Sequence, residues 1–131
     1  VGPGGALVIG LSAGVICCYA TQAIKQRYKS DDSLDVFPVH GVGGMLGTLY
    51  AGIFASDALG VFSGQGYNEG MTMASQVQVQ IVGIVSTFVY TGIATFILLK
   101  LVDAVLGLRI DTEDETRGLD LAEHDERGYD L

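Results

Sequence analysis

The sequence predicts an all-α fold, a polytopic membrane helix bundle with three transmembrane helices followed by a polar C-terminal tail. Of the 131 residues, 49% are apolar and 19 are glycine, which is unlike an ordinary soluble domain. The apolar residues also form three uncharged runs, each at least about the 20 residues that a helix needs to cross a bilayer. The expected transmembrane region is 1–108, with helices at about 4–25, 36–56 and 71–107, and the tail is 109–131.

The first expected helix lies in a run from Val1 to Ile24 that contains no charged residue. Pro3 suits the first turn of a helix, where its missing N–H costs nothing. Gly10 and Gly14 form a small-xxx-small pair, which lets helix backbones approach closely in lipid. The chain starts without Met and without the features of a signal peptide, so we interpret it as part of a longer polypeptide.

The second expected helix carries a single histidine, His40, in an uncharged run of residues 36–56. Asp35 is expected to be the N-cap of this helix, and Pro38 fits its first turn. At the α-helical spacings of three and four, one face of the helix combines the imidazole with Val36, Gly43, Gly44 and Gly47. The glycines on this face allow close helix packing and leave room beside the imidazole.

His40 is the candidate functional residue of this helix. An imidazole inside the hydrocarbon needs partners, because an unsatisfied buried polar group costs about 1–3 kcal/mol. Ionisable residues within a membrane generally face a bundle interior or a wet path. Two interpretations remain open: a neutral histidine that hydrogen-bonds another helix as structural glue, or a functional group that lines a passage. The identity of its partner would decide between them.

The third expected helix begins in an uncharged run from Gly70 to Leu99. The segment QVQVQ at 76–80 alternates as a β-strand does. However, an uncharged run of this length exceeds a barrel strand and favours a helix. We expect Gln76 and Gln80 to be solvated at the membrane interface.

The basic residues predict the orientation of the helices. Lys25, Arg27 and Lys29 lie between the first two expected helices, and the connection between the second and third contains no basic residue. Short cytoplasmic loops are enriched in Lys and Arg. The first helix is therefore expected to run inward and the tail to lie in the cytoplasm. Asp31 and Asp32 are expected to be solvated charges that balance the neighbouring basic residues.

The C-terminal tail holds most of the net charge. Residues 109–131 contain nine acidic residues and three arginines, within a chain of net charge −8. A polar, acidic segment without apolar periodicity is typical of a solvated, disordered end, although spaced apolar residues such as Leu119 could anchor it. The charge also argues against nucleic-acid binding, and we find no constellation of residues typical of an enzyme or a metal site.

Several motifs resemble the ammonium transporter (Amt) family. The segment DVFPVHGVGGMLGTLYAGIFAS at 35–56 is similar to the signature of the tenth transmembrane helix of that family. GGALVIGLSAG resembles the preceding helix, EGMTM the entry to the last helix, and GLRIDTEDETRGLDLAEHDERGY the cytoplasmic tail. The resemblance covers essentially the whole chain and corresponds to the C-terminal third of an eleven-helix transporter. The family often has Gly where this chain has Pro38.

The resemblance implies a role for the second helix. Family members are homotrimers that conduct ammonium as ammonia plus a proton, through a hydrophobic pore in each protomer lined by a hydrogen-bonded histidine pair. His40 matches the second histidine of this pair, and Val36 matches a pore-lining position one turn earlier. Asp35 matches a region at the cytoplasmic mouth. The first histidine, the outer recruitment site and the phenylalanine gate have no counterpart among these residues, and no cofactor is implied.

The resemblance also implies a regulatory role for the tail, at the cytoplasmic side of the cell membrane. In the family this tail is ordered, contacts a neighbouring protomer, and lies near the surface where PII-type signalling proteins bind. The residues that match the tail motifs are Arg109, Gly118, Leu119, Asp120, His124 and Tyr129. We expect His124 to be a packing contact rather than a metal ligand.

Two alternatives to a transporter stay open on the residues alone. The chain could be a proton-relay subunit of another membrane complex, which would need a second titratable group at the depth of His40. It could also be a structural, glycine-rich membrane subunit, in which His40 could be replaced without loss of function.

Overall fold

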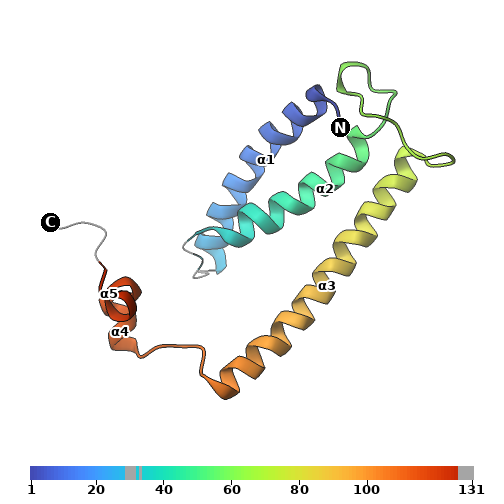
Figure 1. Ribbon diagram of the computed structural model, residues 1–131. Coiled ribbons are helices and arrows are strands. Elements are labelled where there is room, and N and C mark those ends of the chain that lie inside the picture. The colour runs from blue at the N-terminus through green and yellow to red at the C-terminus, as the bar shows by residue number, and fades with distance from the viewer. Residues whose placement is uncertain (29–31, 33, 127–131) are drawn as a thin grey trace. The chain divides into compact units, whose positions relative to one another are not determined.

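The computed structural model describes residues 1–28, 32 and 34–126. Helices are the only regular secondary structure within these residues, so the predicted all-α fold is confirmed (Figure 1). The alternating segment at 76–80 lies inside a long helix and is not a strand. The chain divides into two compact parts, Val1–Phe88 and Val89–Leu131.

Helix α1 spans Pro3–Ala23 and begins with Pro3 in its first turn, as predicted. It continues directly into a π-helical turn, Ile24–Tyr28, which we call the first π turn. The combined helix has 26 residues and the hydropathy of a membrane span. Its length, about 39 Å at 1.5 Å per residue, exceeds the thickness of the hydrocarbon core.

The second predicted helix consists of two unlike segments. A six-residue π-helical turn, Phe37–Val42, which we call the second π turn, leads into the 12-residue helix α2, Gly43–Phe54. This helix packs beside α1 in the first part of the chain (Figure 1). Within the described residues, two helices have by themselves the length and hydropathy of a membrane span, namely Pro3–Tyr28 and Met73–Val105.

A folded connection follows α2 and covers its C-terminal end. It contains a short 3₁₀ helix, Gly60–Phe62. The hydroxyl of Tyr67 lies 2.9 Å from the carbonyl oxygen of Gly52 and 3.1 Å from that of Ile53, and it donates a shared hydrogen bond to them. These carbonyls belong to the last turn of α2, where an α-helix leaves its acceptors unpaired. The connection therefore caps α2 through a tyrosine side chain.

Helix α3 spans Met73–Val105 and starts at a reciprocal cap. The backbone N–H of Thr72 donates to Ser75 Oγ at 2.8 Å, and the N–H of Ser75 donates to Thr72 Oγ1 at 3.2 Å. At the other end Gly107 has a φ of +78°, the left-handed conformation that commonly follows a helix. The observed helix thus lies inside the predicted range of 71–107.

The tail forms two short helices, α4 (Thr112–Arg117) and α5 (Leu119–His124). Gly118 separates them with a φ of +98°, a conformation that favours glycine. The described residues of the tail therefore form regular structure, in line with the ordered tail that the family resemblance implies and unlike the disordered end that is typical of such a composition.

Candidate functional site: the His40 turn

His40 lies in the second π turn, and its side chain is exposed. Its carbonyl oxygen accepts the N–H of Gly43, the first residue of α2. Among the described residues, the imidazole has no hydrogen-bond partner. The predicted pairing of this imidazole with a second histidine therefore stays a prediction.

The π geometry changes which residues share the face of His40. An α-helix has 3.6 residues per turn, so residues four apart are offset by about 40° around the axis. A π turn is wound more loosely, with i→i+5 hydrogen bonds, so α-helical spacing does not describe the face of Phe37–Val42 that carries His40. Val36 is 51% exposed, on the edge of this turn.

The glycines predicted to pack between helices differ in their surroundings. A Cβ added at Gly43 would lie 3.1 Å from Cys17 Sγ, so α1 approaches α2 closely at this residue. At the other four predicted positions a Cβ would meet no atom of the described residues within 4 Å, and their role in packing stays a prediction; they are Gly10, Gly14, Gly44 and Gly47.

The carboxylate of Asp32 caps the start of the His40-bearing helix. The N–H of Val36 donates to Asp32 Oδ1 at 2.9 Å, and the N–H of Phe37 donates to Oδ2 at 3.0 Å. These two bonds, that from Phe37 first, lower the pKa of Asp32 below its ordinary value because they stabilise the charged form. Asp32 thus caps the helix, a role beyond that of the expected solvated charge near Lys25.

Asp35, the expected cap, has a different role. Its φ is +55°, in the left-handed region that Asp tolerates better than most residues. Its Oδ1 is buried and lies 2.8 Å from Lys25 Nζ, in an ion pair rather than an aligned hydrogen bond. The expectation that the Asp35 carboxylate caps the helix is thus wrong, because that carboxylate turns toward the first helix.

Gln76 and Gln80 lie against α2 in the structure. A Cβ at Gly52 would lie 2.8 Å from Cγ of Gln80 and 3.7 Å from Cγ of Gln76. Both glutamines are partly buried, so they pack on Gly52 rather than being fully solvated. The i, i+4 spacing of the two glutamines predicts that they share a helix face. It does not predict that this face contacts Gly52.

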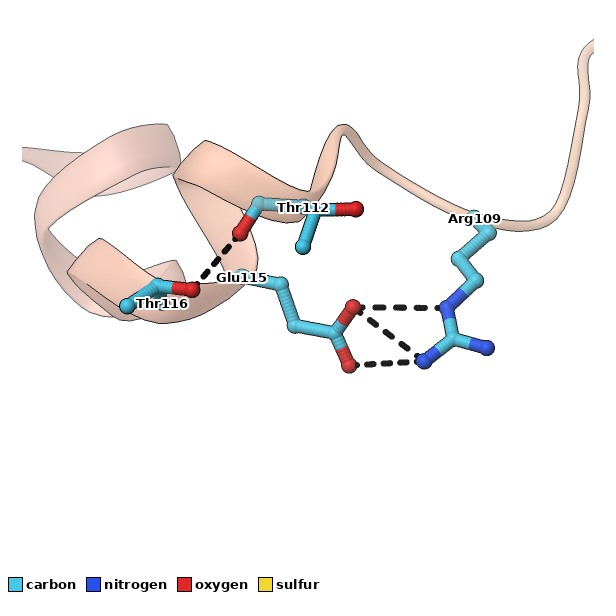
Figure 2. A network of polar contacts seen from close by, with 4 residues as sticks. All are labelled: Arg109, Thr112, Glu115 and Thr116. Carbon is cyan, nitrogen blue, oxygen red and sulfur yellow. Dashed lines mark hydrogen bonds and ion pairs between the residues drawn. The ribbon is translucent and has the colours of Figure 1, made fainter.

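The tail contains a local polar network (Figure 2). The guanidinium of Arg109 donates to both carboxylate oxygens of Glu115, with Nη2 at 2.9 Å from Oε1 and Nε at 3.3 Å from Oε2. These hydrogen bonds, and secondly the charge of the guanidinium, lower the pKa of Glu115. The hydroxyl of Thr116 donates to the carbonyl oxygen of Thr112 at 2.8 Å. Arg109 thereby ties the segment after α3 to helix α4.

Comparison with known proteins identifies the family. Residues 1–129 match the Ammonium Transporter Family. The chain belongs to the ammonium transporter family. It is 43% identical over 131 residues to an ammonium transporter of Mycobacterium tuberculosis, covering 97% of this chain and 27% of that protein. It is 38% identical over 125 residues to the ammonium transporter Amt1 of Archaeoglobus fulgidus, covering 95% of this chain and 31% of that protein.

A third relative is the putative ammonium transporter of Methanothermobacter thermautotrophicus, 43% identical over 129 residues, with 98% of this chain and 31% of that protein covered. The chain thus spans less than a third of the length of the relatives that it matches. Its two long apolar helices and its ammonium transporter relatives together indicate a membrane protein.

The residues that match the family's tail motifs do not form one cluster among the described residues. Arg109 pairs with Glu115, Gly118 forms the turn between α4 and α5, and Leu119 is 53% exposed at the start of α5. Asp120 and His124 are exposed on α5. Tyr129 lies outside the described residues. The proposed regulatory contacts of the tail therefore remain predictions.

Proposed function

We propose that the complete transporter conducts ammonium across the cell membrane as ammonia and a proton, in linked steps, and that His40 is a substrate-conducting residue. Membership of the ammonium transporter family carries this proposal. The exposed imidazole of His40, without a partner in the described residues, supports it. In the proposed site a second imidazole from elsewhere in the protein pairs with His40, and Val36 lines the same pore.

The proposed mechanism follows from the cost of moving charge through hydrocarbon. An ammonium ion loses its hydration at great cost on entering a low-dielectric passage, whereas neutral ammonia crosses far more easily. A neutral imidazole has one donor and one acceptor nitrogen, so a hydrogen-bonded pair can hold ammonia and relay a proton. His40 would then take part in transferring the proton separately from ammonia, and the process would carry net charge.

The proposed setting places the connection between α1 and the second π turn at the cytoplasmic face, because that connection holds the basic residues. The tail would then lie in the cytoplasm as a regulatory segment. By analogy with the family, we propose a homotrimer whose tail contacts a neighbouring protomer, with a PII-type protein as a cytoplasmic partner. Asp35 would lie at the cytoplasmic mouth of the pore.

Replacement of His40 by Ala in the complete transporter tests the proposal. We expect His40→Ala to change the ammonium-evoked current or its substrate selectivity at equal protein abundance in the membrane. Val39→Ala is a matched control, because it also shortens an exposed side chain of the second π turn but removes no titratable group. An unaltered current and selectivity in His40→Ala would overturn the proposal and favour a structural role for the imidazole.

A further inference from the structure

The two π turns lie at the same end of the first two helices and flank the connection between them. The first π turn, Ile24–Tyr28, ends α1, and the second, Phe37–Val42, precedes α2. The second π turn also packs against α1. Turns of this kind occur frequently at functional sites because they re-aim side chains relative to an α-helix. The second of them carries His40.

Polar contacts hold the start of the second π turn. The ammonium of Lys25, on the first π turn, lies 2.8 Å from Asp35 Oδ1. The carbonyl oxygen of Asp35 accepts the N–H of Val39 at 3.0 Å. Asp35 is therefore bonded through its backbone to the turn of His40 and through its side chain to the preceding helix. The Asp32 cap fixes the same end of the turn through two further N–H groups.

We propose that Lys25 and Asp35 are positioning residues, and that their ion pair sets the direction in which the second π turn presents His40. We call this pair the Lys25–Asp35 clasp. The inference rests on the proposed role of His40 in conduction. It adds that the geometry of the conducting site depends on a charge pair outside the pore-lining face.

The burial of one oxygen explains why the clasp is sensitive to either partner. Asp35 Oδ1 is buried, whereas the side chains of Lys25 and Asp35 are 42% and 28% exposed overall. Removal of the ammonium leaves a buried carboxylate oxygen without its counter-charge, which favours movement of Asp35 toward water. Such a movement displaces the carbonyl group that begins the turn, and the displacement reaches His40 within one turn.

Proline stabilises the conformation that the clasp selects. Pro38 is fully buried in the first turn and fixes its own φ. Asp35 has the left-handed φ of +55°, which Asn also tolerates but a β-branched residue does not. Asp35→Asn therefore removes the charge of the clasp while keeping the backbone conformation, and this makes it a clean test variant.

The test measures the ratio of ammonium-evoked to methylammonium-evoked transport in the complete protein. This ratio does not depend on how much protein is folded, so a purely structural loss leaves it unchanged. We expect Lys25→Gln and Asp35→Asn each to alter the ratio, by about two- to fivefold for a partly exposed pair. We expect Lys25→Arg to retain the ratio of the unmodified protein. The double variant, Lys25→Gln with Asp35→Asn, should change the ratio no more than either single variant does, because each substitution removes the same interaction.

Arg27→Gln is the matched control, because Arg27 carries the same charge on the same π turn. It should leave the ratio unchanged, which separates the clasp from a general change in surface potential. A Lys25→Gln ratio equal to that of Arg27→Gln, or single effects that simply add in the double variant, would overturn the inference. If Lys25→Gln does not reach the membrane, Asp35→Asn decides in the same way.

The failure of this inference is distinguishable from the failure of the proposed function. Unchanged transport in His40→Ala refutes the conducting role of the imidazole, whatever the clasp variants do. If His40→Ala alters transport but the clasp variants leave the transport ratio unchanged, only the positioning role of the Lys25–Asp35 clasp is refuted.

Discussion

The contact between Gly52 and Gln80 gives a prediction whose size follows from the structure. A Cβ at Gly52 would lie 2.8 Å from Cγ of Gln80, whereas ordinary contacts begin at 3.4 Å. Gly52→Ala therefore requires α2 and the glutamine stem to separate by at least about 0.6 Å. Cγ is the second carbon of that side chain, so Gln80 cannot relieve the clash by moving only its flexible end.

The expected cost is the balance of two effects. Overpacking lowers the free energy of unfolding by about 1–3 kcal/mol. Replacing Gly by Ala inside a helix raises it by about 1 kcal/mol, because Ala has the higher helix propensity. Gly52→Ala should therefore destabilise the protein by about 1 kcal/mol, within a range of about 0–2 kcal/mol. In a Gln80→Ala background the clashing carbon is gone, so the same substitution should become neutral or stabilising by up to about 1 kcal/mol.

Equilibrium unfolding of the complete transporter in mixed micelles measures these free energies. The four proteins of the double-mutant cycle are the unmodified protein, Gly52→Ala, Gln80→Ala and the combination of both. The coupling between the two substitutions should be about 1–3 kcal/mol, equal to the overpacking that Gln80→Ala relieves. Additive effects, or a more stable Gly52→Ala protein in the unmodified background, would refute the reasoning.

Two further predictions concern carboxylates outside the membrane spans. Because the folded pKa of Asp32 is lowered, its cap is complete above the unfolded pKa of the group and is lost as the pH falls through the folded pKa. Hydrogen exchange should show that protection of the two capped amides declines in acid, and that Asp32→Ala abolishes this pH dependence; equal protection in both proteins would exclude the cap. In the tail, Glu115→Gln should lower protection across α4 by weakening the bond to Arg109, whereas Glu113→Gln on the same helix should not. Equal effects of the two substitutions would show that the Arg109 pair does not order α4.

The positions of the helices could be predicted from the sequence because lipid imposes a strong constraint. Uncharged runs of sufficient length predict spanning helices. Pro3 is in the first turn of α1, where proline is favoured, and Gly107 follows the end of α3, where glycine is favoured. The segment of α3 that resembled a strand, residues 76–80, was assigned correctly by the length of the surrounding run.

The local geometry of the His40 turn could not be predicted in the same way. The shared face was predicted with α-helical spacing, and a π turn does not follow that spacing. Pro38 and the glycines that follow it weaken an α-helical register and were the available signal. Asp35 was the expected cap, and nothing in the sequence indicated its left-handed backbone conformation or the two N–H groups that Asp32 accepts instead.

The glycine and tail predictions depended on partners that the sequence does not name. Small-xxx-small pairs indicate that helices can approach closely, but the neighbour decides which glycine is needed. Gly52 proved to be a contact point although it was not among the glycines predicted to pack between helices. In the tail, the pairing of Arg109 with Glu115 spans six residues and follows from the turn into α4.

The most direct test of the account is an experimental structure of the complete transporter that resolves the surroundings of the His40 ring. We expect a nitrogen of this ring to lie about 2.7–3.2 Å from a nitrogen of a second imidazole, beside a passage that also contacts Val36. A His40 ring that lies against lipid, or that hydrogen-bonds a backbone carbonyl with no passage beside it, would contradict the account.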